Sequence, residues 1–238
     1  MTAKVVQFKQ IGPVNFTKNR RSKNIKIRVK PDQSVHVSFP FFVTMFEVSQ
    51  FVDKNLGWIK SQQHKFETRK SKIEAGKFQT KLHCVSVIEG SENKTKVNFN
   101  EIEIRLADFN SDSSRSYLVN VMVGIYRFEA RKILPSRLTG LAQKHGFQFN
   151  KLTIRNNKRN WGSCSSRNNI SLNLQMMKLP DELIDYVLLH ELVHTLIKNH
   201  GPLFWAKLDE LTNFRARELS KQVRLYSTYF TSLNLSNK

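Results

Sequence analysis

An almost wholly apolar segment in the last third of the chain constrains the fold most. It contains His190, Glu191 and His194 among residues that are otherwise hydrophobic at nearly every position: Leu183, Ile184, Val187, Leu188, Leu189, Leu192, Val193, Leu196 and Ile197. A helix that is hydrophobic nearly all round is buried. Burying two imidazoles and a carboxylate without a ligand is costly. The segment therefore predicts a central helix whose polar side chains serve a bound group.

The spacing of these side chains indicates a metal site. His190 and His194 are four residues apart, so in a helix they project from the same side and can bind one ion together. Glu191 lies beside them and can take a proton from a water that the metal activates. Two such histidines with this glutamate are typical of zinc hydrolases. We expect one zinc ion, with His190 and His194 as ligands and Glu191 as the general base.

A catalytic zinc usually takes three protein ligands, and His200 is the preferred third one. It follows His194 by six residues, so a continuous helix would carry it about 240° round. Asn199 tolerates a left-handed helix end, and Gly201-Pro202 does not continue a helix. A helix break at Asn199 would therefore return His200 to the metal.

Two carboxylates from later helices, Glu218 and Glu210, are the alternative third ligands. The spacing from the helix to His200 matches the extended metzincin pattern. However, Ile197 stands where that pattern needs glycine, so no metzincin is implied.

The first third of the chain reads as strands followed by a helix. Lys23–Lys30 alternates apolar and basic residues, and residues 35–39 alternate again after a turn, which predicts a hairpin. Thr44 and Glu47 match a capping box, and the helix that they begin should run to about Arg69. Further strands are expected at 81–89 and 95–107.

The polar stretch 109–115 is the expected domain boundary. We predict an α+β fold, with a β-rich N-terminal unit over 1–108 that includes one long helix. The second unit, 109–238, should be a mainly helical, zincin-like zinc-binding domain with a small sheet. Its expected elements are helices at 114–133 and 136–146, strands at 149–155 and 170–175 around a loop at 156–169, a helix from Pro180, and helices at 202–211 and 213–227. No internal repeat is evident.

The charge of the chain favours polyanionic partners. Lys and Arg number 39 against 19 Asp and Glu, which gives a net charge of +20 and a pI of about 10.1. Nucleic acid or nucleotides are therefore candidate partners of a basic surface. Only Cys84 and Cys164 are present, which indicates a reducing compartment. Since no apolar run has the length of a signal peptide core or a membrane span, we expect a cytoplasmic protein.

Several segments together resemble one family. They are Trp161-Gly162-Ser163-Cys164-Ser165-Ser166, Asn169-Ile170-Ser171-Leu172-Asn173, Asp185-Tyr186-Val187, His190–His194, Asn199-His200 and Phe204-Trp205. They are similar to those of the YgjP-like metallopeptidases, relatives of the SprT-like and minigluzincin-type zinc proteins. The resemblance implies zinc at His190, His194 and His200, and Glu191 as catalytic base. Asn160 stands where that family usually has a basic residue, with Arg159 one position earlier.

Four residues are weaker candidates for contacts with a substrate. Trp161 and Ser163 precede a predicted strand and could form a cleft rim, because a strand beside the metal often pairs with an extended peptide. Arg159 belongs to a basic run that would favour anionic substrates. Tyr186 lies four residues before His190 and could hydrogen-bond an oxyanion. For Trp161 and Tyr186, packing in the core is the alternative.

Three functions are compatible with this sequence. The first is a zinc metallopeptidase that cleaves proteins or peptides. The second is a metal-dependent hydrolase of nucleoside triphosphates, although no Gly-rich phosphate loop is present. The third is a nucleic-acid-binding module with a structural zinc, for which three local ligands are too few.

Overall fold

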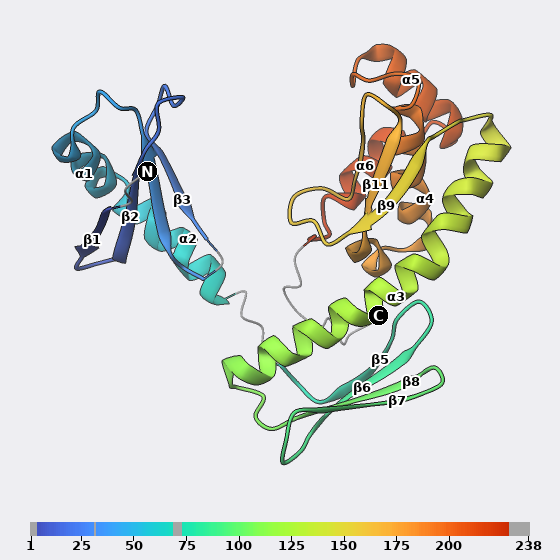
Figure 1. Cartoon of the computed structure of the whole chain (residues 1–238), viewed down its shortest axis with the longest axis horizontal. Helices are drawn as coiled ribbons and strands as arrows, with labels where there is room; N and C mark the ends of the chain where they lie inside the picture. The colour runs from blue at the N-terminus through green and yellow to red at the C-terminus, as the bar shows by residue number, and fades with distance from the viewer. Residues whose placement is uncertain (1–3, 31, 69–72, 229–238) are drawn as a thin grey trace. The chain divides into compact units, whose positions relative to one another are not determined.

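The computed structural model describes residues 4–30, 32–68 and 73–228, and the chain divides into two compact units, Met1–Ser71 and Lys72–Lys238 (Figure 1). The boundary expected at residues 108 and 109 differs from this division. Four strands between residues 76 and 106 belong to the second unit, because buried side chains on them share one core with the helix that follows. The first unit has a separate core.

The first unit contains a four-stranded sheet in the order β1-β2-β4-β3. The strands are β1 (Lys4–Phe8), β2 (Gly12–Lys18), β3 (Lys26–Val29) and β4 (Val35–Phe39). β3 pairs antiparallel with β4, which confirms the predicted hairpin. The outer pair β1 and β2, which the sequence analysis did not anticipate, is antiparallel, whereas β2 and β4 run parallel.

Two helices, α1 (Met45–Lys54) and α2 (Leu56–Thr68), follow the sheet. The predicted capping box is present: the Thr44 backbone donates to Glu47 Oε2 at 2.8 Å, and the Glu47 backbone donates to Thr44 Oγ1 at 3.3 Å. One continuous helix was expected, but it is interrupted at Asn55. The Asn55 side chain donates to the Phe51 carbonyl at 2.7 Å and so competes with the backbone. The expected end at Arg69 lies outside the described residues.

The second unit begins with another four-stranded sheet, in the order β5-β6-β8-β7. Its strands are β5 (Gly76–Gln79), β6 (Cys84–Glu89), β7 (Lys94–Asn98) and β8 (Glu101–Leu106). The prediction of a strand at 81–89 is confirmed in β6. The single strand expected at 95–107 is in fact the hairpin β7–β8, which turns at Phe99 with a φ of 50°.

The two sheets have the same topology, although no repeat is evident in the sequence. In each, the first and second strands are antiparallel, the second and fourth are parallel, and the third and fourth are antiparallel. A helix follows the fourth strand in both. The chain therefore uses one ββββα arrangement twice, once in each unit.

A single helix, α3 (Asp112–His145), connects the second sheet to the rest of its unit. Two helices separated at Pro135 were expected, but Pro135 lies inside α3. Proline removes one backbone donor and bends a helix without necessarily ending it, and α3 is bent (Figure 1). Residues buried on α3, such as Leu118, Met122 and Leu134, place it in the centre of the larger core.

The remainder of the second unit forms the layer that carries the predicted metal motif. It consists of β9 (Lys151–Arg155), β10 (Gly162–Cys164), β11 (Asn169–Asn173), the 3₁₀ helix η1 (Leu174–Lys178), α4 (Asp181–Val193), α5 (Pro202–Leu211) and α6 (Ala216–Val223). The strand order is β10-β11-β9. The predicted strand pair is confirmed as the parallel pair β9–β11. The intervening segment, expected to be a loop, also contains β10.

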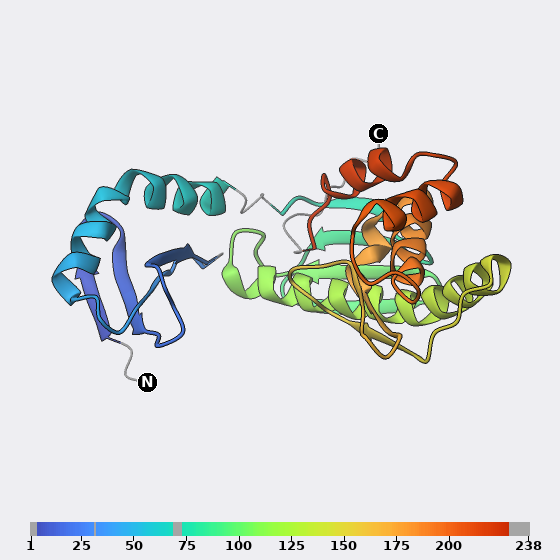
Figure 2. The ribbon, with the colours of Figure 1, turned by 90° about the horizontal axis from the view of Figure 1, so that it is seen from above.

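In Figure 2 the helices α4 to α6 and the small sheet lie together in the second unit, alongside α3. None of the helices in the described ranges is long and apolar enough to cross a membrane.

Candidate metal centre

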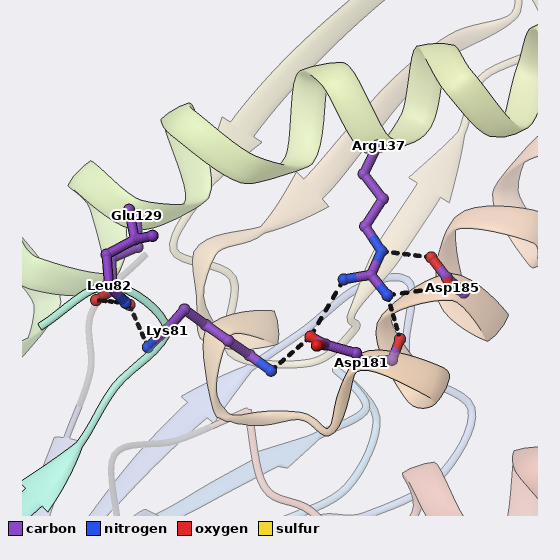
Figure 3. A network of polar contacts seen from close by, with 6 residues as sticks. All are labelled: Lys81, Leu82, Glu129, Arg137, Asp181 and Asp185. Carbon is purple, nitrogen blue, oxygen red and sulfur yellow. Dashed lines mark hydrogen bonds and ion pairs between the residues drawn. The ribbon is translucent and has the colours of Figure 1, made fainter.

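Ion pairs attach the start of the motif helix α4 to α3 and to the β5–β6 turn (Figure 3). Arg137 of α3 donates to Asp185 Oδ2 at 2.9 Å and to Asp181 Oδ1 at 3.1 Å. Lys81 approaches Asp181 Oδ1 at 2.7 Å, and its hydrogen bond lowers the pKa of that carboxyl. These contacts fix α4 at the end opposite to the histidines.

A fully buried carboxylate, Glu129 of α3, holds the turn that carries Lys81. It accepts from the Leu82 backbone at 2.9 Å and from the Lys81 backbone at 3.3 Å (Figure 3). His83 Nδ1 contacts it at 2.8 Å. A buried charge is tolerated only when it is hydrogen-bonded in this way, so the turn has one defined position against α3.

α4 ends at Val193, six residues before the break predicted at Asn199, and His194 is its C-cap. The Thr195 backbone donates to the Leu192 carbonyl at 2.9 Å, and the Thr195 hydroxyl donates to the same carbonyl at 2.7 Å. This tight i to i−3 turn replaces the helical pattern, and the chain leaves the helix axis directly after the second histidine.

The turn brings His190, His194 and His200 together. His200 Nε2 lies 3.1 Å from His190 Nε2 and 3.1 Å from His194 Nε2, and the ligating atoms of all three lie within 4.8 Å of one another. Zinc–nitrogen bonds of about 2.05 Å in a tetrahedral arrangement place two nitrogens about 3.3 Å apart. The three nitrogens therefore have the spacing that one zinc ion requires.

Hydrogen bonds to the backbone orient the His194 ring and hold the loop that carries His200. His194 Nδ1 lies 3.0 Å from the Ile197 carbonyl, and a carbonyl only accepts, so the proton resides on Nδ1 and the lone pair of Nε2 faces the other histidines. Trp205 Nε1 donates to the His200 carbonyl at 3.1 Å. Lys198 donates to Asn168 Oδ1 at 2.6 Å and to the Ser165 carbonyl at 3.1 Å, which attaches the ligand loop to the β10–β11 turn.

Phe204 forms the floor of the site, and the sequence analysis gave it no role of its own. It is fully buried, and its ring centroid lies 4.9, 4.5 and 4.7 Å from those of His190, His194 and His200. Its position four residues after His200, in a helix that begins at Pro202, is the only sequence signal that could have indicated this contact.

Burial affects the protonation of His190 and His194. Burial, together with the neighbouring His194 and His200, lowers the pKa of His190 to about 3. Burial also lowers the pKa of His194. Neutral imidazoles keep a lone pair available, which is the form that metal ions bind.

Glu191 follows His190 directly in α4. It is only 5% exposed, its Oε2 has no hydrogen-bond partner in the described part of the chain, and burial raises its pKa to about 8. A cation nearby would favour the ionised carboxylate. A Cβ added to Gly162 of β10 would come within 2.6 Å of Glu191 Cγ and Oε1, so the strand passes directly over the carboxylate. The three imidazole nitrogens and this orphaned buried oxygen fit a zinc ion and a water.

The alternative third ligands are occupied elsewhere. Glu218 accepts from Arg215 Nη2 and Nε, each at 2.9 Å, and the hydrogen bonds lower its pKa. Glu210 pairs with Lys207 at 2.9 Å. Within the described ranges, neither carboxylate belongs to the cluster of potential ligands that contains His200.

The four weaker candidates are not brought together at the metal. Trp161 is partly buried against the core, and its carbonyl accepts from the Asn173 backbone at 2.8 Å. Ser163 is exposed on β10, and Arg159 is exposed in the preceding loop. The Tyr186 ring centroid lies 6.1 Å from that of His190, but its hydroxyl bonds Ser220 of α6. This geometry favours packing over an oxyanion role for Tyr186.

Comparisons with known proteins match the chain to one family model and to two solved structures. The sequence model of the YgjP-like family, described as a metallopeptidase domain, matches residues 23–223. Among the curated proteins, none matches the chain. The metallopeptidase zymogen abylysin of Pyrococcus abyssi is 22% identical, with a TM-score of 0.36 over 39% of this chain and 93% of its own. The zymogen jannalysin of Methanocaldococcus jannaschii is 23% identical, with a TM-score of 0.34 over 38% and 92%.

Proposed function

We propose that this chain, which belongs to the YgjP-like metallopeptidase family, is a zinc-dependent peptidase that uses Glu191 as its general base. The observation that carries the proposal is the buried Oε2 of Glu191, unpartnered among the described residues, together with a His200 Nε2 that lies 3.1 Å from both His190 Nε2 and His194 Nε2. Three ligands leave a fourth position for a reacting group, as in catalytic rather than structural zinc sites. His200 completes the set in preference to Glu218 or Glu210.

The residues divide the reaction between them. When bound by His190, His194 and His200, zinc would supply a Lewis acid that polarises the scissile carbonyl and lowers the pKa of a water. Glu191 takes the proton of the attacking water at Oε2 and passes it to the leaving amine. Phe204 excludes water from the far side of the rings, which keeps the imidazoles in one orientation.

β10 is suited to hold an extended peptide. It is an edge strand, with β11 on one side only. The Trp161 carbonyl accepts from the Asn173 backbone, and the Ser165 backbone donates to the Asn169 carbonyl. The alternation of an antiparallel pair therefore directs the backbone N–H groups of Gly162 and Cys164 to the open edge. A substrate strand added there would pass over Glu191, with Ser163 at the rim. The substrates of this reaction are accordingly proteins or peptides in extended conformation.

The test combines metal analysis with an unbiased peptide-library digest of the full-length protein, read by mass spectrometry. The Glu191→Gln variant should retain zinc and lose hydrolysis, whereas the matched Glu218→Gln variant should keep both. Full hydrolysis by Glu191→Gln would refute the assignment of the base. Zinc-dependent release of phosphate or pyrophosphate from nucleoside triphosphates, without peptide cleavage, would replace the peptidase with the phosphoanhydride hydrolase.

A further inference from the structure

The first unit carries a surface on which aromatic rings and basic side chains alternate. β2 and β4 are parallel neighbours, and Lys18 at the end of β2 is in register with Phe39 at the end of β4. The two loops that follow these strands therefore leave the sheet at the same edge, and the Asn19 backbone donates to the Phe39 carbonyl at 2.8 Å. We call this surface, formed by Lys18, Arg20, Arg21, Phe41, Phe42 and Phe46, the aromatic–basic edge.

The rings of this edge are open to solvent. Phe41, Phe42 and Phe46 are 60%, 79% and 72% exposed. Cations lie against one of them: Lys18 Nζ is 5.0 Å and Arg20 Cζ is 5.5 Å from the Phe41 ring centroid, within the range of a cation–π contact. Three large apolar side chains so exposed within six residues mark an interaction surface rather than a requirement of the fold.

The second sheet shows that the fold does not need these residues. There the loop after the second strand is Gly90-Ser91-Glu92-Asn93, with an acidic residue in place of the arginines. The loop after the fourth strand contains one aromatic residue, Phe109, which packs against the core. The same ββββα arrangement thus forms without exposed rings or arginines in the loops after its second and fourth strands. At these positions, both features are particular to the first unit.

The charge of the first unit indicates which kind of partner the aromatic–basic edge binds. Residues 1–71 contain 14 of the 39 basic and 4 of the 19 acidic residues, so less than a third of the chain holds half of its net charge of +20. Single-stranded nucleic acids combine a phosphate backbone with bases that stack on exposed aromatic rings. A bilayer fits less well, because burying Phe41 in hydrocarbon would bury the cations that lie on its ring. We propose that the aromatic–basic edge binds single-stranded nucleic acid.

The aromatic and the basic residues of this edge have separate roles. Phe42 and Phe46 provide faces for bases, whereas Arg20 and Arg21 neutralise phosphates. Base stacking on a protein ring is independent of sequence, because every base has a π-face. The phosphate contacts release counterions and make binding sensitive to salt. The site therefore binds strands without strong sequence preference, independently of whether the metal centre cleaves peptides.

The experiment measures the binding of fluorescein-labelled oligo(dT) to the full-length protein by anisotropy. The double variant Phe42→Ala/Phe46→Ala should weaken binding by about tenfold for each ring removed. It should not change binding to an abasic strand of the same length, which has phosphates but no bases. Phe99→Ala, which removes a ring that is 95% exposed in the second unit, is the matched control and should bind like the unchanged protein.

The basic residues are tested through the salt dependence. Arg20→Gln/Arg21→Gln should reduce the slope of log K against log salt by about 0.7 for each cation removed, whereas Lys96→Gln in the second sheet should leave it unchanged. Equal affinities of the Phe42→Ala/Phe46→Ala and Phe99→Ala proteins for oligo(dT) would overturn the proposal. The proposal would also be overturned if the unchanged protein bound phosphatidylserine vesicles and the Phe42→Ala/Phe46→Ala variant lost this binding but still bound oligo(dT).

Discussion

Replacing Gly162 with alanine tests the contact between β10 and the proposed base most directly. The added Cβ would lie 2.6 Å from Glu191 Cγ and Oε1 and 2.8 Å from Cδ, whereas ordinary contacts begin at 3.4 Å. The Glu191 side chain or the strand must therefore withdraw by about 0.8 Å. Because α4 is buried and attached at its start by Arg137, the carboxylate and β10 are the parts that can move.

The expected effect on catalysis is large and that on stability is moderate. A displacement of about 1 Å in a reacting group costs on the order of 100-fold in rate, so kcat of Gly162→Ala should fall by about that factor. Overpacking in a well-packed site typically costs about 1–3 kcal/mol. The free energy of unfolding should decrease by that amount, without loss of the fold. The three atoms nearest to the added Cβ all belong to Glu191 and none to a histidine, so zinc content should be unchanged.

The assay compares peptide hydrolysis, zinc content and thermal unfolding of the Gly162→Ala protein with those of Gly140→Ala. Gly140 lies inside α3, and an added Cβ meets nothing within 4 Å, so this control should stay fully active and gain up to about 1 kcal/mol. If Gly162→Ala hydrolyses peptides at the unchanged rate, β10 does not pass over the catalytic carboxylate in the active protein. If its zinc content falls together with activity, the strand supports the metal instead.

Three further predictions concern the metal and the second unit. His200→Ala should weaken zinc binding by more than about 100-fold in a competition with a chromophoric chelator, beyond what outer-shell changes cause; an equal loss in Glu218→Gln would contradict the ligand assignment. Arg137→Gln should lower the free energy of unfolding by about 1–2 kcal/mol, because partly exposed ion pairs contribute little beyond their hydrogen bonds. Zinc content should not change. An unchanged melting temperature would show that the ion pairs of Arg137 do not hold α4. Burial lowers the pKa of Lys178 to about 8 from 10.5, so between pH 8 and 10.5 the unfolded state binds a proton that the native state lacks. The free energy of unfolding should therefore rise with pH by up to about 1.4 kcal/mol per pH unit. Lys178→Met should remove this slope in urea titrations, and an unaltered slope would assign the pH dependence to another group.

Elements whose sequence signal lies within a few neighbouring residues could be predicted from the sequence. The capping box at Thr44 and Glu47 placed the start of α1, because the signal lies within four residues. The start of α4 at Asp181 and the pairing of β3 with β4 were equally local. The choice of His200 over Glu218 and Glu210 stays a prediction, which the short-range ion pairs of the two carboxylates favour.

Features that depend on distant partners could not be predicted in this way. β10 contains three residues, too few for a periodic pattern, and it exists because β11 pairs with it. Pro135 was expected to end a helix, but burial of the α3 face that includes Leu134 and Leu138 compensates for one lost hydrogen bond. The boundary expected at residue 108 followed a change in composition, whereas the actual division follows the packing of β5–β8 against α3.

The loop between His194 and His200 explains how a ligand outside the helix can belong to a defined site. A flexible ligand would have to lose conformational entropy on binding the ion, which reduces affinity. Here the Ile197 carbonyl, the Lys198 side chain and the Trp205 indole each fix the loop at a separate point. Because Lys198 attaches the same loop to the β10–β11 turn, His200 and the strand proposed to bind substrate are held in one relative position.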